Sequence, residues 1–96
     1  MASKKLVFFQ YSGDLSISGE LANELFYLFP DKTVAVAYIK GNSAQISLRA
    51  AHDIREKTAK AMQGIEGRSG GHRNACAANI AVSDLLKFRD NLKKLI

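Results

Sequence analysis

Apolar residues in the first third of the chain follow first the pattern of a strand and then that of a helix. Residues 6–11 form a short aromatic run that ends at a Ser-Gly-Asp turn cluster, which predicts a strand. Ser18 is the predicted N-cap of the helix that follows, and Pro30 its predicted stop, because the residue before a proline is displaced from helical geometry. The predicted apolar face of this helix comprises Leu21, Leu25, Leu28 and Phe29.

Two further strands are predicted in the middle of the chain. Residues 33–39 are apolar on both faces, which is typical of a central strand covered on both sides. Residues 40–43 (Lys-Gly-Asn-Ser) predict a hairpin turn, and residues 44–49 alternate strictly between apolar and polar positions. One face of that strand would carry Ala44, Ile46 and Leu48, and the other Gln45, Ser47 and Arg49.

The second half predicts a helix, a loop, a strand and a final helix. Residues 53–56 (Asp-Ile-Arg-Glu) resemble a capping box with an aspartate as N-cap residue, and Gly64 is the predicted C-terminal stop. Residues 66–71 are expected to form a loop, and residues 76–82 a strand of small apolar residues. Ser83 is the predicted N-cap of the last helix, whose apolar face would comprise Leu85, Phe88, Leu92 and Leu95.

The predicted elements follow in the order βαββαβα, which indicates an α/β fold: a small mixed β-sheet flanked by helices. No internal repeat, low-complexity segment or interdomain linker interrupts this pattern. We therefore expect a single domain over residues 4–96.

Composition narrows the class of protein. The chain has 96 residues, of which 47% are hydrophobic, so a globular domain can form without disulfides. Its one cysteine, Cys76, cannot form an internal disulfide, and the N-terminal apolar run is too short for a signal peptide or a membrane span. These features favour a cytoplasmic protein with no membrane partner. The net charge of +5 is compatible with nucleic-acid binding and equally with a generally basic surface.

The glycine-rich stretch 67–74 is the main candidate for chemistry. Its glycines let the backbone approach a ligand closely and could form a nest of N–H groups that suits an anion. The alternative is an ordinary surface loop, since glycine is common in loops. The residues that would bind a phosphate here are Arg68, Ser69, Gly70, Gly71, His72, Arg73 and Asn74.

A second candidate is Arg49, at the end of a predicted strand and on the same face as Ser47. An arginine in that place can clamp a phosphate through two nitrogens. The alternative is a surface salt bridge to Asp53 or Glu56. The sequence carries none of the common hydrolase motifs and too few carboxylates and histidines near the glycines for a metal site. No catalytic or metal-binding residue is therefore predicted in this chain.

Three stretches of the chain resemble a known family. Residues 69–72 (Ser-Gly-Gly-His), followed by residues 75–77 (Ala-Cys-Ala), are similar to the Gly-Gly-Gly-His-x-x-Ala-Ala-Gly signature of the DHH-associated domain. Residues 46–49 (Ile-Ser-Leu-Arg) resemble the family's Ile-Ser-x-Arg strand, and residues 18–25 resemble the first helix of archaeal-type members. This domain is the C-terminal part of the DHH phosphoesterases, which include RecJ-like exonucleases, nanoRNases and pAp phosphatases. The C-terminal domain of alanyl-tRNA synthetase is a further relative.

The resemblance implies a division of labour. The family's catalytic domain binds manganese or magnesium and hydrolyses the substrate, while the DHH-associated domain binds the nucleotide or phosphate. No Asp-His-His motif occurs in this chain. We therefore expect a substrate-binding domain without a cofactor of its own, acting with a DHH catalytic domain in cis or in trans. The expected ligand is single-stranded nucleic acid, a short oligonucleotide or a nucleotide. The alternatives are a stand-alone protein-interaction module and an enzyme in its own right.

Overall fold

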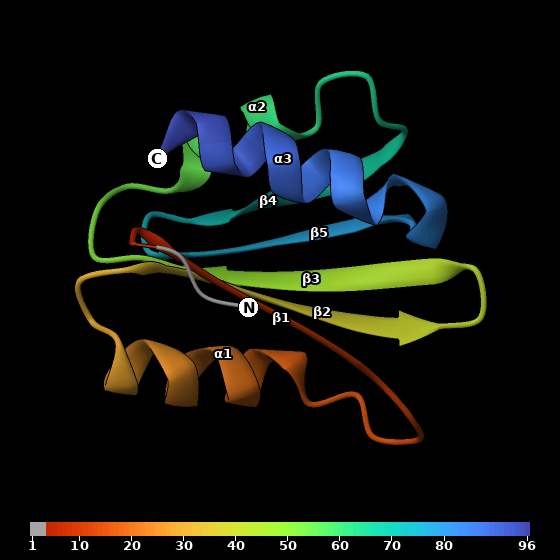
Figure 1. Cartoon of the computed structure of the whole chain (residues 1–96), viewed down its shortest axis with the longest axis horizontal. Coiled ribbons are helices and arrows are strands. Elements are labelled where there is room, and N and C mark those ends of the chain that lie inside the picture. The colour runs from red at the N-terminus through yellow and green to blue at the C-terminus, as the bar shows by residue number, and fades with distance from the viewer. Residues whose placement is uncertain (1–3) are drawn as a thin grey trace.

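The computed structural model describes residues 4–96 as five strands and three helices. One sheet has the strand order β1-β2-β3-β5-β4, in which β1 and β2 are parallel and all other pairs antiparallel. Helix α1 (Ser18–Leu28) covers one face, and α2 (Arg55–Ala61) and α3 (Leu85–Leu95) cover the other (Figure 1). This confirms the predicted α/β fold with a mixed sheet. The strands are β1 (Leu6–Ser12), β2 (Thr33–Lys40), β3 (Ser43–Arg49), β4 (Gly67–His72) and β5 (Ala75–Ala81).

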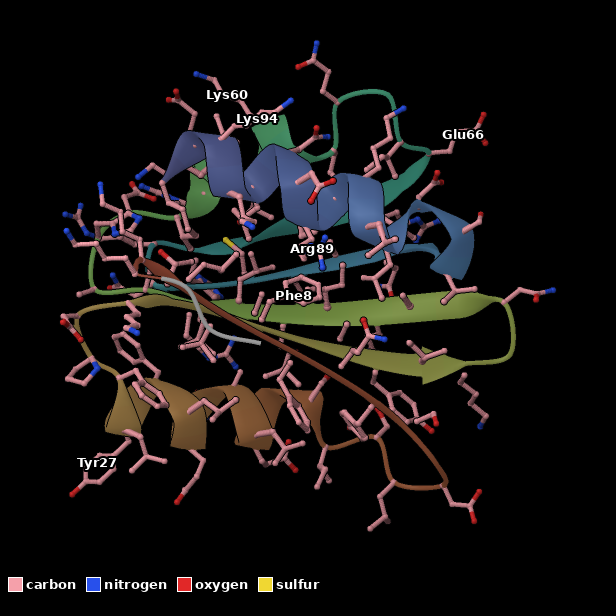
Figure 2. All side chains as sticks on the ribbon, viewed as in Figure 1. Phe8, Tyr27, Lys60, Glu66, Arg89 and Lys94 are labelled. Atoms are coloured by element: carbon pink, nitrogen blue, oxygen red, sulfur yellow. The ribbon has the colours of Figure 1, made fainter. Side chains whose placement is uncertain are left out.

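The larger core lies between the sheet and the two helices α2 and α3. Ile46 and Leu48 of β3 point into it, as the strict alternation of that strand predicts, and both are fully buried beside Phe88 and Leu92 of α3. Phe8 reaches the same core from β1 (Figure 2). Strand β2 is buried from Thr33 to Tyr38, which confirms that it is covered on both faces.

A smaller core lies under α1. Ala22 is fully buried, and Leu25, Phe26 and Phe29 pack around it at the spacing i, i+3, i+4 and i+7. Leu21, Leu25 and Phe29 of the predicted apolar face pack in this core, whereas Leu28 was wrongly included, because it points away from the sheet and is 60% exposed. Phe26, which the leucine spacing left out, contributes to this core in its place.

The predicted loop over residues 66–71 was wrong, because Gly67–His72 form the edge strand β4, paired antiparallel with β5. An extended strand points successive N–H groups to opposite edges, so this segment forms no anion-binding nest. At Gly71 a Cβ atom would lie 2.5 Å from the carbonyl oxygen of Ala75 and 2.7 Å from the Cα of Cys76. The glycine therefore allows the two strands of the hairpin to approach closely.

The predicted serine caps were also wrong. Ser18 is the first residue of α1 and makes no capping hydrogen bond; its buried hydroxyl accepts one from Ser47 instead. Ser83 lies within a short 3₁₀ helix, η1 (Val82–Asp84), that precedes α3 and begins where the strand over 76–82 was expected to end.

The capping box over residues 53–56 is not formed, and the N-cap residue of α2 is Ile54 and not Asp53. The Asp53 carboxylate accepts a hydrogen bond from the backbone N–H of Arg55 at 3.1 Å, but Glu56 pairs with Lys60 and so makes no reciprocal bond. Gly64, the predicted stop of this helix, has a φ of 74°, which confirms its place after the helix end.

Gly71→Ala should destabilise the domain by about 1–3 kcal/mol, because the new methyl group overlaps the backbone of β5. The free energy of unfolding in urea measures this change. Gly70→Ala is the matched control, since its Cβ would have no atom within 4 Å and its backbone is also extended with positive φ. Equal losses of unfolding free energy in the two variants would show that the close approach of β4 and β5 is not the reason for a glycine at position 71.

Candidate functional site

Helix α1 covers β1, β2 and the near side of β3, and leaves the α1 side of β5 and β4 without a helix (Figure 1). Cross-strand partners point to the same side of a sheet, so the pairing register places three rows of side chains on this surface. We call these three rows the open face. The first row is Arg49, Ala75 and His72; the middle row is Ser47, Ala77 and Gly70; the third row is Gln45, Asn79 and Arg68.

A seam of hydrogen bonds joins the open face to α1 and to the residues just before it. Each row contributes one bond from its β3 side chain. These bonds join Asn23 to Arg49 (2.7 Å), Ser18 to Ser47 (3.0 Å) and Ser16 to Gln45 (3.2 Å). The seam fixes the β3 side chains at the border between the α1 core and the solvent-exposed strands.

Arg49 is held in place by two of its three nitrogens. Its Nε donates to Asn23 and its Nη1 to the carbonyl oxygen of Leu48 (2.8 Å), whereas Nη2 has no hydrogen-bond partner within residues 4–96. A Cβ on Gly19 would lie 3.6 Å from Nη2, so this nitrogen lies against the first turn of α1. Partial burial lowers the pKa of Arg49, but a guanidinium stays charged at neutral pH.

The salt bridge considered for Arg49 is not formed. Asp53 pairs with Arg55 at 2.6 Å, and this hydrogen bond and charge hold the pKa of the Asp53 carboxyl below its usual range. Glu56 pairs with Lys60. Within the described part of the chain, Arg49 therefore carries a positive charge that no carboxylate neutralises.

The middle row makes the floor of the open face, because none of its side chains is larger than serine. Ala77 is exposed between Ser47, which is 8% exposed, and Gly70. A ligand can therefore reach the backbone of β5 and β4 at this level.

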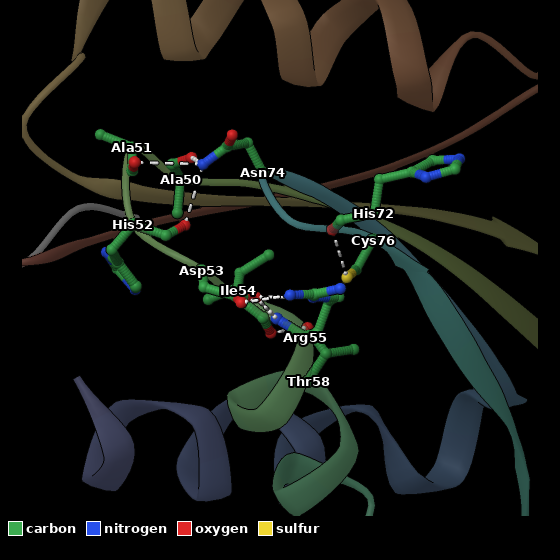
Figure 3. Close-up of polar contacts among 10 residues, drawn as sticks. All are labelled: Ala50, Ala51, His52, Asp53, Ile54, Arg55, Thr58, His72, Asn74 and Cys76. Carbon is green, nitrogen blue, oxygen red and sulfur yellow. Dashed lines mark hydrogen bonds and ion pairs between the residues drawn. The ribbon is translucent and has the colours of Figure 1, made fainter.

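His72 and Arg68 flank this floor on β4, and both are exposed. Figure 3 shows the His72 ring on the α1 side of the sheet. Neither side chain makes a hydrogen bond or ion pair within residues 4–96, while the carbonyl oxygen of His72 accepts a hydrogen bond from the Cys76 thiol at 3.3 Å. Both side chains thus offer donors to a ligand on the open face.

Four of the predicted site residues lie elsewhere. Ser69 and Gly71 alternate with the open-face residues and point to the α2 side of the sheet, in register with Ala78 and Cys76. Arg73 and Asn74 form the turn between β4 and β5. The structure therefore brings together Ser47, Arg49, Arg68, Gly70 and His72 and separates them from Ser69, Gly71, Arg73 and Asn74.

Asn74 connects the β4–β5 turn to the segment between β3 and α2. Its amide nitrogen donates to the carbonyl oxygens of Ala50, Ala51 and His52 at 3.0–3.1 Å (Figure 3). The backbone supports the same link, since Ala50 N–H donates to the Asn74 carbonyl at 3.2 Å. Asn74 thereby holds the β4–β5 hairpin, and with it His72, against the end of β3.

Sequence reasoning missed two other parts of the open face. Asn79 and Gln45 make up most of the third row, opposite each other in register. The polar side of residues 44–49 pointed to Gln45, and Asn79 is the one polar residue within the apolar run 76–82. The α1 side of the seam gave no comparable signal, because Ser18 was interpreted as a helix cap and nothing in the sequence distinguishes Ser16 or Asn23.

The chemistry of the open face suits an anion. It carries two arginines and a histidine, small residues between them, and no carboxylate. In residues 4–96 no three His, Cys, Asp or Glu side chains come close enough together to hold a metal ion. No helix in the same range is long and apolar enough to cross a membrane.

A family model described as the DHHA1 domain matches residues 3–96. A search of curated protein sequences gives no match to this chain. The match to the family model covers all three stretches on which the resemblance was based: residues 18–25, the Ile46–Arg49 segment of β3 and the glycine-histidine strand β4.

Solved structures share the fold at low sequence identity. The C-Ala domain of alanyl-tRNA synthetase from Aquifex aeolicus aligns with a TM-score of 0.67 and 18% identity, over 95% of this chain and 85% of that chain. RecJ from Thermus thermophilus, in complex with Mg²⁺, aligns with a TM-score of 0.77 and 16% identity, over 95% of this chain and 14% of that chain. The pGpG-specific phosphodiesterase PggH from Vibrio cholerae aligns with a TM-score of 0.62 and 15% identity, over 96% of this chain and 33% of that chain. The chain thus spans only a small part of the two longer proteins.

Asn74→Ala should lower the free energy of unfolding by about 1–3 kcal/mol, because three carbonyl groups lose their shared donor. Urea denaturation followed by circular dichroism measures this loss. Asn79→Ala is the control: it removes an exposed asparagine without a hydrogen-bond partner in residues 4–96 and should change stability by less than about 0.5 kcal/mol. Equal stability of the two variants would rule out Asn74 as a structural link.

Proposed function

The chain belongs to the DHHA1 domain family, and from that premise we propose that it binds a phosphate of single-stranded nucleic acid or of a nucleotide on the open face. The observation that carries this proposal is the convergence of unpaired hydrogen-bond donors on a floor of small residues. Arg49 and His72 lie in one row, on either side of Ala75. Their backbones are two strand spacings apart, or about 10 Å, so a phosphate over Ala75 would lie between the two side chains.

Phosphate binding requires donors that are not already used. Arg49 is oriented by Asn23 and Leu48 and keeps Nη2 for a ligand. A guanidinium or imidazolium that bonds a phosphate makes a charge-assisted hydrogen bond, stronger than a neutral one. Because Arg49 is already held in position, little side-chain entropy is lost when the ligand binds.

The remaining candidate residues support these two. Arg68 lies two rows from His72 on the same strand and would meet a neighbouring phosphate of an oligonucleotide. Arg73 lies in the adjoining turn, and its charge acts on Asp53 before α2. Ser47 and Gly70 form the floor, Asn74 and Gly71 hold the hairpin in shape, and Ser69 lies on the opposite side of β4.

We further propose that hydrolysis belongs to a separate DHH catalytic domain, in cis or in trans, which would hold manganese or magnesium. RecJ and the pGpG-specific phosphodiesterase support this division, since the chain aligns with only 14% and 33% of their lengths. In this arrangement the open face would hold the phosphate of a short strand or dinucleotide while the other domain acts on it.

A protein-interaction role is the second candidate, and a different surface favours it. Tyr27 lies on the outer side of α1, away from the sheet, and is 82% exposed (Figure 2). The next residue, Leu28, is 60% exposed. Exposed large apolar side chains close together can mark a contact with another protein. Binding of a partner protein that tolerates His72→Ala and fails with Tyr27→Ala would support this role.

Arg49→Ala and His72→Ala should each weaken binding of a 5′-phosphorylated single-stranded oligonucleotide by roughly tenfold to a hundredfold, because each removes a charge-assisted contact worth about 1.5–3 kcal/mol. Fluorescence titration at two salt concentrations measures the affinity, which should fall with salt. Lys94→Ala, on the outer side of α3, is the control for net charge (Figure 2). If Arg49→Ala and His72→Ala bind the oligonucleotide as tightly as Lys94→Ala does, the open face is not the binding site.

Ala77→Val should also weaken binding by at least about tenfold, because the larger side chain fills the floor between Ser47 and Gly70. Stability should be unchanged or slightly higher, since valine favours a strand and the position is exposed. Ala77→Gly keeps the floor open and should retain wild-type affinity. The same titration, with urea denaturation beside it, separates a blocked site from a damaged fold. Wild-type affinity in Ala77→Val would contradict binding over the middle row.

A further inference from the structure

The open face continues past its middle row into a cavity of about 280 Å³. The cavity is lined by Tyr38, Lys40, Ser43, Gln45 and Asn79. The strand register places all five on the same side of the sheet, since Tyr38 pairs with Gln45, Gln45 with Asn79, and Lys40 with Ser43. The cavity and the register thus agree that this end of the face is a concave extension of the proposed phosphate site.

We propose that this cavity binds a nucleobase, so that the ligand of the open face is a nucleotide unit and more than a phosphate alone. This inference rests on the proposed phosphate contact at Arg49 and His72. In this proposal, the amide side chains of Gln45 and Asn79 form hydrogen bonds with the edge of the base.

The two amides face each other across neighbouring strands with donors and acceptors available. Gln45 uses its Oε1 to accept a hydrogen bond from Ser16 at 3.2 Å, which fixes the amide and points its nitrogen elsewhere. Asn79 is exposed and makes no side-chain hydrogen bond within residues 4–96. A primary amide presents a donor and an acceptor side by side, and asparagine and glutamine pair with base edges in this way. Unstacked bases of single strands expose those edges.

The inner wall of the cavity is rigid and partly apolar. Tyr38 is only 4% exposed, its hydroxyl donates to the carbonyl oxygen of Gly13 at 2.5 Å, and its ring packs against Tyr11 with centroids 5.0 Å apart. The aliphatic stem of Lys40 lies beside it, with the ammonium free to remain in water. A volume of about 280 Å³ lies at the lower end of small-molecule pockets, about 300 Å³, and suits one heterocycle.

The distance between the two ends of the face fits a nucleotide. Gln45 and Arg49 are four residues apart on β3, or about 14 Å at roughly 3.4 Å per residue. A phosphate alone cannot reach from Arg49 to Gln45, whereas a nucleotide can, and its sugar would lie over Ser47 and Ala77.

The test compares two ligands that differ only in the base: deoxyadenosine 5′-monophosphate and deoxyribose 5-phosphate. Isothermal titration with the whole chain should give at least about tenfold tighter binding of the nucleotide, since two or more base-edge hydrogen bonds are lost without the base. Gln45→Ala and Asn79→Ala should each reduce affinity for the nucleotide by about fivefold and leave affinity for the sugar phosphate unchanged. Gln63→Ala, on the other side of the sheet, is the matched control for an exposed glutamine.

The outcomes separate the two proposals. If His72→Ala weakens binding of both ligands, but Gln45→Ala and Asn79→Ala weaken binding of neither, the phosphate site stands and the base site is overturned. If the two ligands bind wild type equally, the base site is likewise overturned. If His72→Ala and Arg49→Ala leave binding of both ligands unchanged, the proposed function fails, and the base site fails with it.

Discussion

The width of a helix limits how much of a sheet it can cover, and this limit determines where the domain can bind anything. A helix with its side chains is about 10 Å across, and strands lie about 4.8 Å apart, so one helix covers about two strand spacings. The face with α2 and α3 has two helices for its five strands, and the core there reaches β5. The other face has only α1, so β5 and β4 remain open on that side. The site, its polar border and its small floor all follow from this difference.

A sheet surface without a helix must still be compatible with water and with a stable sheet. Polar side chains at the border solve the first problem: the seam from β3 to the α1 segment satisfies Ser47 and orients Arg49 and Gln45 without burying a charge completely. Small residues on β5 and β4 add to this compatibility with water, because they leave no large apolar patch exposed, and the hydrogen-bonded pairing of β4 with β5 holds the edge of the sheet together. The same two solutions produce what a ligand needs, namely oriented donors around an accessible floor.

The sequence predicted most of the fold because most elements bury a periodic apolar face. The alternation of residues 44–49 identified both the core side of β3 and the polar side that carries Ser47 and Arg49. Strand β4 escaped prediction for a physical reason: three of its six residues are glycines, so it has no side-chain alternation, and pairing with β5 alone defines it. The serine caps failed because a hydroxyl can bond across to a neighbouring strand as well as to its own helix. Arg49 and His72 were recognisable as candidates, but their approach to each other depends on the β3–β5–β4 register, which local patterns do not specify.

The glycine-histidine segment also shows why a contiguous motif is a poor guide to a contiguous site. In a loop, Ser69, Gly70, Gly71 and His72 could all face one ligand, whereas in a strand successive residues point to opposite sides. Gly70 and His72 therefore belong to the open face, and Gly71 to the contact with the β5 backbone. Asn74 then fixes the turn of this hairpin to the end of β3, so that His72 and Arg49 keep their places in one row. The motif thus combines ligand contacts with the residues that hold them in position, and only the register separates the two.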